Sequence, residues 1–182
     1  MGFGGYLTWT AVAREIYKKY ANPKLRLMPC EMQGKTITKI VKSPIFYNNP
    51  YCYRDTHSRH KDLDLFPLQL NNPETNYCKL DTPQRCEQRC DKHCIEQICE
   101  YYGIKNPELK CELYFTDEEN EHIDKLTKDL DDSFLVIEPH SKTDYTPNKE
   151  YSYEKWQNVV NELSKKYQIV QIGNKNKPIL DN

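Results

Sequence analysis

The sequence predicts an α/β fold, and the pattern of residues 134–173 makes the strongest case for it. A β-branched and aromatic run at 134–137 is followed by a long polar segment, a helical pattern, and a second apolar run at 167–172 that ends at Gly173. The apolar positions of the helical pattern are Trp156, Val159, Val160 and Leu163. Strand, helix and strand in this order form a βαβ unit with parallel strands.

Ligands of such units bind outside the carboxyl ends of the strands, so we expect a site in the loop at residues 138–152. This loop contains two prolines and many polar residues. Ser152 is placed to cap the following helix, and Glu154 lies in its first turn, where a carboxylate favours the helix dipole.

The chain begins with the glycine-rich sequence Gly2-Phe3-Gly4-Gly5, directly before a helical pattern that ends near Tyr20. Glycines before a helix let the backbone approach a ligand and leave helix N–H groups pointing at it. The alternative is a flexible N-terminus followed by an ordinary helix. Such a loop normally follows a strand, so the first strand of the fold is expected to be missing.

Residues 24–28 and 35–41 are β-prone and predict two strands. Residues 43–53 are rich in turn residues and aromatics. Residues 54–84 predict a long irregular segment, which in a compact domain is usually functional or disordered.

Two helices are expected in the middle of the chain. One covers residues 91–102 and ends at Gly103 as its cap. The other starts at a capping-box sequence, residues 116–119, and carries an apolar face. Acidic residues that follow it predict a solvated turn at a domain junction.

We therefore expect one α/β domain over residues 1–132 and the start of a second over residues 133–182, of which only the βαβ unit is present. A parallel sheet of two strands buries too little apolar surface to be stable alone. It is expected either to pack on the first domain or to belong to a longer protein.

The composition favours a soluble protein in the cytoplasm. The 182 residues have a net charge of −1 and 29 % charged residues of both signs, which gives no support to a nucleic-acid surface. No apolar run approaches the roughly 20 residues that span a bilayer, and no secretory signal is evident. A disulfide framework is therefore not expected for the eight cysteines.

Four cysteines cluster at Cys86, Cys90, Cys94 and Cys99. If this segment is a helix, the first three lie on one face, with the outer two roughly 12 Å apart. Sulfurs that share a zinc ion lie within roughly 4.6 Å of each other, so at most two neighbours can share one. The favoured interpretation is small apolar residues on a half-buried helix, with no bound metal. A cysteine-rich metal-binding protein is the alternative.

Several sequence blocks resemble one known family. The glycine-rich start precedes a helix, and the later blocks are HCIEQICEYYGI, NPELKCELYFTDEE, VIEPHSKTDYTPNKEYSYEKWQNVVNEL and VQIGN. Together they resemble glycosyltransferase family 9, the ADP-heptose:lipopolysaccharide heptosyltransferase-like proteins, most specifically over residues 136–163. The resemblance implies GT-B architecture, with a Rossmann-like acceptor-side domain followed by an incomplete donor-side domain.

The resemblance also implies a reaction. A sugar passes from a nucleotide-sugar to a hydroxyl of a glycan or lipid-linked acceptor, with inversion and without a metal or further cofactor. Peripheral contact with a membrane is compatible with such an acceptor. The chemistry needs a base for the acceptor proton, groups that stabilise the departing diphosphate, and a closed cleft.

The family implies the following site residues. Gly4 and Gly5 match the substrate-binding N-terminal loop, but Gly5 stands where the family has its aspartate base. Ser141 and Lys149 match the hydroxyl and lysine that contact the donor phosphates, with Lys142 as a competitor. His140 is a candidate base or phosphate donor, and a structural capping role is its alternative.

Two interpretations follow for the whole chain. By family it is an enzyme, a shortened glycosyltransferase, because it ends before the later loop that completes the nucleotide pocket. No turnover is expected from this chain alone, because Gly5 cannot act as a base. The alternative is a non-catalytic α/β binding or interaction module derived from such an enzyme.

Overall fold

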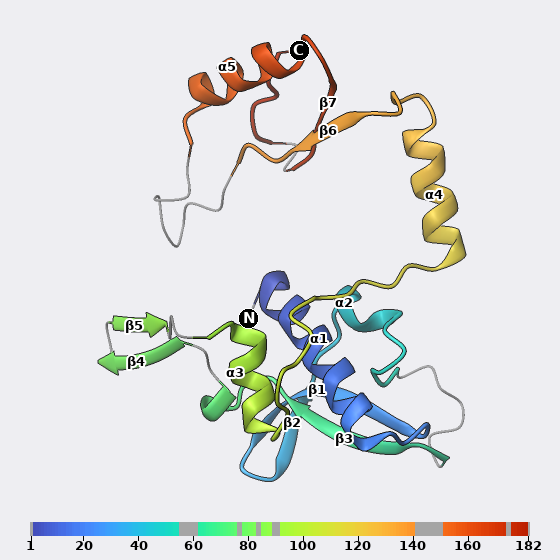
Figure 1. Cartoon of the computed structure of the whole chain (residues 1–182), viewed down its shortest axis with the longest axis vertical. Helices are drawn as coiled ribbons and strands as arrows, with labels where there is room; N and C mark the ends of the chain where they lie inside the picture. The colour runs from blue at the N-terminus through green and yellow to red at the C-terminus, as the bar shows by residue number, and fades with distance from the viewer. Residues whose placement is uncertain are drawn as a thin grey trace. The chain divides into compact units, whose positions relative to one another are not determined.

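The computed structural model describes residues 2–54, 62–75, 78–82, 85–88, 92–140, 151–173 and 176–181. They form a mixed α/β protein, as the sequence predicts, with helices and small sheets (Figure 1). The chain divides into two compact units, Met1–Asp117 and Glu118–Asn182. Within the described residues, no helix combines the length and the apolar character that crossing a membrane requires.

The first unit is built on a three-stranded sheet with the order β2-β1-β3. Strand β1 (Leu25–Gln33) pairs antiparallel with β2 (Thr36–Ile40) and parallel with β3 (Asp64–Gln69). The strands predicted at residues 24–28 and 35–41 are therefore confirmed. Between β2 and β3 the chain forms a short helix, α2 (Pro44–Tyr47).

The irregular segment predicted at residues 54–84 is wrong where β3 and the strand β4 (Cys78–Thr82) lie, and also at the 3-10 turn Pro73–Thr75. Strand β3 contains Pro67, which weakens any strand prediction because proline cannot donate to a ladder. Among the described residues, β3 pairs with β1 alone, so it is an edge strand, where a proline is tolerated.

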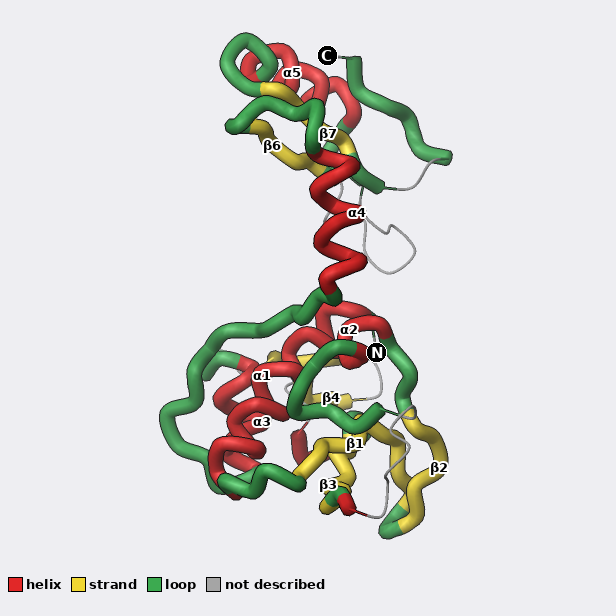
Figure 2. The backbone as a smooth tube through the Cα atoms, turned by 90° about the vertical axis from the view of Figure 1, so that its right-hand side faces the viewer, coloured by secondary structure: helices red, strands yellow, loops and turns green. Residues whose placement is uncertain are grey.

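The helix α1 (Phe3–Tyr20) lies against α2, α3 and β1, as Figures 1 and 2 show. Its buried face joins β1, β3 and α3 (Cys94–Tyr101) in one hydrophobic core. The largest fully buried apolar side chains of this core are Trp9, Val12, Ile16, Leu27, Leu68, Ile95 and Ile98.

The helix considered for Cys86 through Cys94 is not formed. Cys86 lies in the strand β5 (Arg85–Gln88), which pairs antiparallel with β4 (Cys78–Thr82), whereas Cys94 begins α3. Cys90 lies outside the described residues. The helix starts only at Cys94 for two reasons. His93 caps it, because its ring nitrogen Nδ1 accepts from the Ile95 N–H at 3.2 Å, and the buried apolar side chains of α3 begin at Ile95.

The predicted end of this helix is confirmed. Gly103 follows α3 with φ +64, the left-handed conformation typical of a residue that ends a helix. Its N–H donates to the Glu100 carbonyl at 2.8 Å.

The second unit contains the predicted βαβ arrangement. Strands β6 (Phe134–Ile137) and β7 (Gln168–Gln171) are parallel and joined through α5 (Tyr153–Leu163). The core of the unit is small and consists of buried Val160, Ile169 and Leu180, with partly buried neighbours around them. Helix α4 (Asp117–Thr127) precedes β6 and has no buried residue.

Candidate functional site

The carboxyl ends of β6 and β7 lie side by side and define the candidate site. The strands are in register from Phe134 opposite Gln168 to Ile137 opposite Gln171. The ladder extends one bond further, because the Ile172 N–H donates to the Ile137 carbonyl at 2.9 Å. The residues that follow each strand therefore meet at one edge of the sheet, where βαβ units bind ligands.

Glu138 and Gly173 are the first of these residues to meet. Gly173 has φ +133, a conformation that side chains rarely adopt. A Cβ atom at Gly173 would lie 2.7 Å from the carboxyl carbon of Glu138, well inside van der Waals contact. The backbone conformation therefore favours glycine here, whereas the Glu138 carboxylate is the end of a flexible side chain and can move aside for a Cβ. In the sequence, the signal for this pair was an acid directly after one strand and a glycine after the next.

His140 is held at the same edge by two hydrogen bonds. Its backbone N–H donates to Glu138 Oε1 at 3.1 Å, and its ring Nε2 lies 2.8 Å from the Pro178 carbonyl. Since a carbonyl only accepts, Nε2 carries a proton, and Nδ1 of the neutral ring keeps its lone pair. The contact with Pro178 is a structural role, and Nδ1 retains the capacity to accept a proton.

The N-terminus of α5 is built as predicted. Ser152 has extended backbone dihedrals and its hydroxyl accepts from the Lys155 N–H at 3.4 Å, which makes it the N-cap. Glu154 lies in the first turn. The remaining residues predicted for this loop, Ser141, Lys142 and Lys149, lie outside the residues that the structure describes.

Gly4 and Gly5 lie in the first turn of α1, not in a loop before it. The helix begins at Phe3, with Gly2 as its N-cap, and the Tyr6 N–H closes the first turn on the Gly2 carbonyl at 3.2 Å. A Cβ at Gly4 would have no atom within 4 Å, so packing does not require glycine there. The loop expected at residues 2–5 is thus wrong from Phe3 onward, because an 18-residue helix outweighs the cost of its glycines.

Three cysteines of the first unit, Cys30, Cys52 and Cys99, are buried core residues. Burial raises the pKa of the Cys52 thiol to about 12, and burial together with the nearby Glu15 carboxylate raises that of Cys99 to about 12. Cys30 is also buried, whereas Cys111 is exposed. Among the residues that the structure describes, no group of three or more His, Cys, Asp or Glu side chains is arranged to hold a metal ion.

We expect iodoacetamide to modify Cys111 of the native protein at neutral pH and to leave Cys52 and Cys99 unmodified. The reagent attacks thiolates, and burial keeps the two core thiols protonated and covered. Mass spectrometry of tryptic peptides measures the labelling of each cysteine. Labelling in urea is the control and should reach all three, and rapid native labelling of Cys52 would contradict its place in the core.

No protein-family model matches this chain, and no curated protein or solved structure is significantly similar to it. The function of the chain is therefore inferred from its own residues and from the edge formed by β6 and β7.

Proposed function

We propose that this chain is a glycosyltransferase-like protein that binds a nucleotide-sugar at the carboxyl edge of β6 and β7. The observation that supports the proposal is the parallel βαβ unit, whose β6–α5 loop leaves this edge. On this proposal, Glu118–Asn182 belongs to a Rossmann-like donor domain of GT-B type, and Met1–Asp117 belongs to the domain that binds the acceptor. The family resemblance of residues 136–163 supports the same assignment.

The diphosphate of the donor is the group that the loop is suited to hold. Ser141, Lys142 and Lys149 belong to this loop, which supplies a hydroxyl and two cations. The capped N-terminus of the 11-residue helix α5 adds backbone N–H donors and a positive dipole end. Such groups stabilise a departing nucleoside diphosphate without a metal ion.

The acceptor hydroxyl must lose its proton, and Gly5 has no side chain to take it. We assign this role to His140, whose Nδ1 keeps a lone pair while Nε2–H is bound to Pro178. The products are an inverted glycoside on a glycan or lipid-linked acceptor and a free nucleoside diphosphate. The reaction is proposed for the cytoplasm, with at most peripheral contact to a membrane.

Binding of UDP, GDP and ADP to the full chain tests the proposal. One of them should raise the melting temperature, because a ligand that binds only the folded state stabilises it. Replacing Lys142 and Lys149 together with alanine should weaken this nucleotide at least about tenfold, since charge-assisted hydrogen bonds to phosphate are lost. Isothermal titration calorimetry measures the affinity of both proteins.

Lys165 and Lys166 provide the matched control. Both follow α5 at its far end, and Lys165 pairs with Glu162 at 2.8 Å. Their double alanine variant removes the same charge and should leave nucleotide affinity unchanged. Equal weakening by both double variants would mean that net charge alone, and not a site at the β6–α5 loop, attracts the nucleotide.

A non-catalytic binding module is the second candidate, and Gly5 in place of a carboxylate favours it. The two candidates differ in turnover. Release of the nucleoside diphosphate from a nucleotide-sugar in the presence of an acceptor, lost in a His140→Ala variant, supports the enzyme. Tight nucleotide binding without any release supports the module.

A further inference from the structure

The backbone of residues 178–181 is bound by side chains, although these residues belong to no helix or strand. We call this segment the strap. Gln171, the last residue of β7, donates from Nε2 to the Pro178 carbonyl at 3.1 Å, and its Oε1 accepts from the Leu180 N–H at 2.9 Å. A single amide side chain thus offers the strap one donor and one acceptor, as a residue of a neighbouring strand does.

Gln157 of α5 repeats this arrangement one residue further along the strap. Its Nε2 donates to the Asp181 carbonyl at 2.6 Å, and its Oε1 accepts from the Asp181 N–H at 2.9 Å. The Leu180 side chain, 5 % exposed, packs in the core of the second unit with Val160 and Ile169. The strap is therefore held in place by its backbone as well as by a buried side chain.

Two donors at the candidate site are also bound to the strap. The His140 ring donates from Nε2 to the Pro178 carbonyl at 2.8 Å, and the Tyr153 hydroxyl donates to the Ile179 carbonyl at 3.1 Å. His140 follows β6 at the carboxyl edge of the sheet, and Tyr153 is the first residue of α5. The strap therefore presents two consecutive carbonyl oxygens to donors at the edge where the nucleotide is proposed to bind.

These two carbonyls satisfy donors that phosphate oxygens would otherwise use. The imidazole N–H of His140 and the phenol O–H of Tyr153 each have one hydrogen to donate. They cannot give it to the strap and to a diphosphate at the same time. Phosphate is the stronger acceptor, because hydrogen bonds to an ionised group are shorter and stronger than those to a neutral one. Since Nε2 stays protonated with either acceptor, Nδ1 of His140 keeps its lone pair in both cases.

We propose that the strap is an autoinhibitory lid that competes with the nucleotide for the carboxyl edge of β6 and β7. Entry of the diphosphate displaces the two strap carbonyls, and His140 and Tyr153 then donate to phosphate oxygens. The bonds with Gln171 and Gln157 determine how firmly the strap is held, so they lower the apparent affinity of the nucleotide. This inference rests on the nucleotide site proposed above.

Isothermal titration calorimetry of the full chain and of a Gln157→Ala, Gln171→Ala double variant tests the competition. The double variant loses the four hydrogen bonds of the two glutamines to the strap, so the strap is displaced more easily. We expect whichever of UDP, GDP and ADP binds to bind this variant about tenfold more tightly than the wild-type chain. Gln168→Ala is the matched control. It removes a glutamine that accepts from the Asp131 N–H at 2.7 Å at the other end of β7, and it should leave the affinity unchanged.

Hydrogen exchange followed by NMR tests the same release in the wild-type chain and does not depend on the folding of a variant. The Leu180 and Asp181 N–H groups donate to the two glutamines, so they should be protected from exchange. Both should exchange at least several-fold faster when the nucleotide binds. The Ile172 N–H, which donates to the Ile137 carbonyl at 2.9 Å in the sheet ladder, is the control and should keep its protection.

The outcomes separate this inference from the proposed function. Nucleotide binding that leaves Leu180 and Asp181 protected, or that is no tighter in a folded double variant, overturns the lid and leaves the nucleotide site standing. Binding to the double variant alone supports both, since the strap then blocks the edge in the wild-type chain. If neither protein binds UDP, GDP or ADP, the proposed function fails and the lid fails with it.

Discussion

Replacing Arg14 with alanine is expected to lower the free energy of unfolding of the first unit by about 3–5 kcal/mol. The Arg14 side chain is 2 % exposed and is shared among three carboxylates and two backbone carbonyls. Its Nε lies 2.8 Å from Glu15 Oε1, and one Nη lies 3.1 Å from Glu112 Oε1. Without it, the nearly buried carboxylate of Glu15 would lose its closest cationic partner.

Arg14 also fastens the segment that follows α3. Its two terminal nitrogens donate to the carbonyls of Glu108 at 2.7 Å and Lys110 at 2.9 Å. The Glu112 N–H donates to the Thr10 hydroxyl at 3.0 Å, one helical turn before Arg14. Burial lowers the pKa of Arg14, but the hydrogen bonds with Glu15 and Glu112 outweigh it, so the pKa is raised above its ordinary value. The charge is thus retained in the core by its partners.

Lys18→Ala is the matched control. Lys18 pairs with Glu15 at 3.3 Å and with Glu108 at 3.6 Å, but its side chain is 53 % exposed. An exposed pair of this kind contributes less than about 1 kcal/mol. Urea unfolding in a Trp156→Phe background measures both variants, because Trp9, buried in the first unit, is then the sole tryptophan. Similar losses for Arg14→Ala and Lys18→Ala would show that the buried network does not hold the unit together.

The elements that the sequence predicted are those whose pattern is local. Strands β1 and β2 follow from β-prone runs, and β6, α5 and β7 from a change of apolar period from strand to helix. Strand β3 could not be predicted in this way, because Pro67 breaks its pattern and its support comes from parallel pairing with β1, which is distant in sequence.

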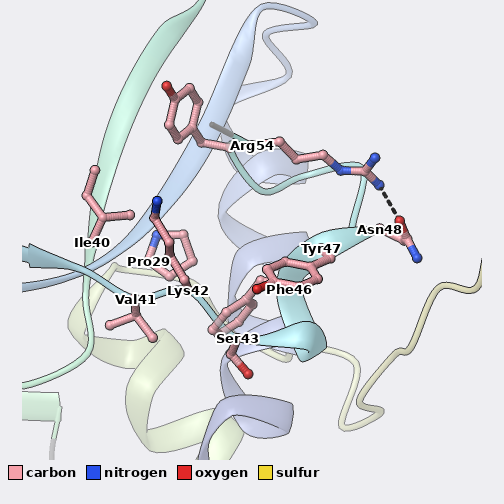
Figure 3. A pocket seen from close by; sticks show the side chains of 10 residues that line it. Pro29, Ile40, Val41, Lys42, Ser43, Phe46, Tyr47, Asn48 and Arg54 are labelled. Atoms are coloured by element: carbon pink, nitrogen blue, oxygen red, sulfur yellow. Dashed lines mark hydrogen bonds between the residues drawn. The ribbon is translucent and has the colours of Figure 1, made fainter. Parts of the chain in front are cut away.

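The same distinction holds for the sites. The Ser152 cap is a local signal and was predicted, because the N-cap residue directly precedes the helix that it starts. The pocket of about 360 Å³ between β1, the end of β2 and α2 was not, since it arises where segments around Val41 and Tyr53 diverge from one edge of β1 (Figure 3). Local glycine content likewise favoured a loop at Gly4, but the buried face of α1 further along the chain extends the helix through it.

Gly173→Ala is expected to destabilise the second unit by about 1–3 kcal/mol, mainly through backbone strain at φ +133. The Glu138 carboxyl group overlaps the new Cβ but is the end of a flexible, exposed side chain, so it moves aside and gives up only its hydrogen bond from the His140 N–H. Gly34→Ala separates the two causes. Gly34 also has positive φ, +57, but a Cβ there would meet nothing within 4 Å. The Gly34→Ala variant should lower the free energy of unfolding only by the strain of a left-handed residue, about 1–2 kcal/mol. Thermal unfolding followed by Trp156 fluorescence in a Trp9→Phe background measures the stability of the Gly173→Ala variant. Trp9 fluorescence in a Trp156→Phe background measures that of the Gly34→Ala variant.

A Glu138→Ala change in the Gly173→Ala protein should restore only the small part of the loss that comes from displacing the carboxylate, and should leave the backbone strain. This partial rescue is a coupling between the two residues that follow β6 and β7, and a double-mutant cycle measures it directly. Strictly additive losses would mean that the Glu138 carboxylate turns away from Gly173 at no cost. The two residues would then not constrain each other through the Glu138 side chain, and the backbone ladder of β6 and β7 alone would fix the edge proposed to receive the nucleotide.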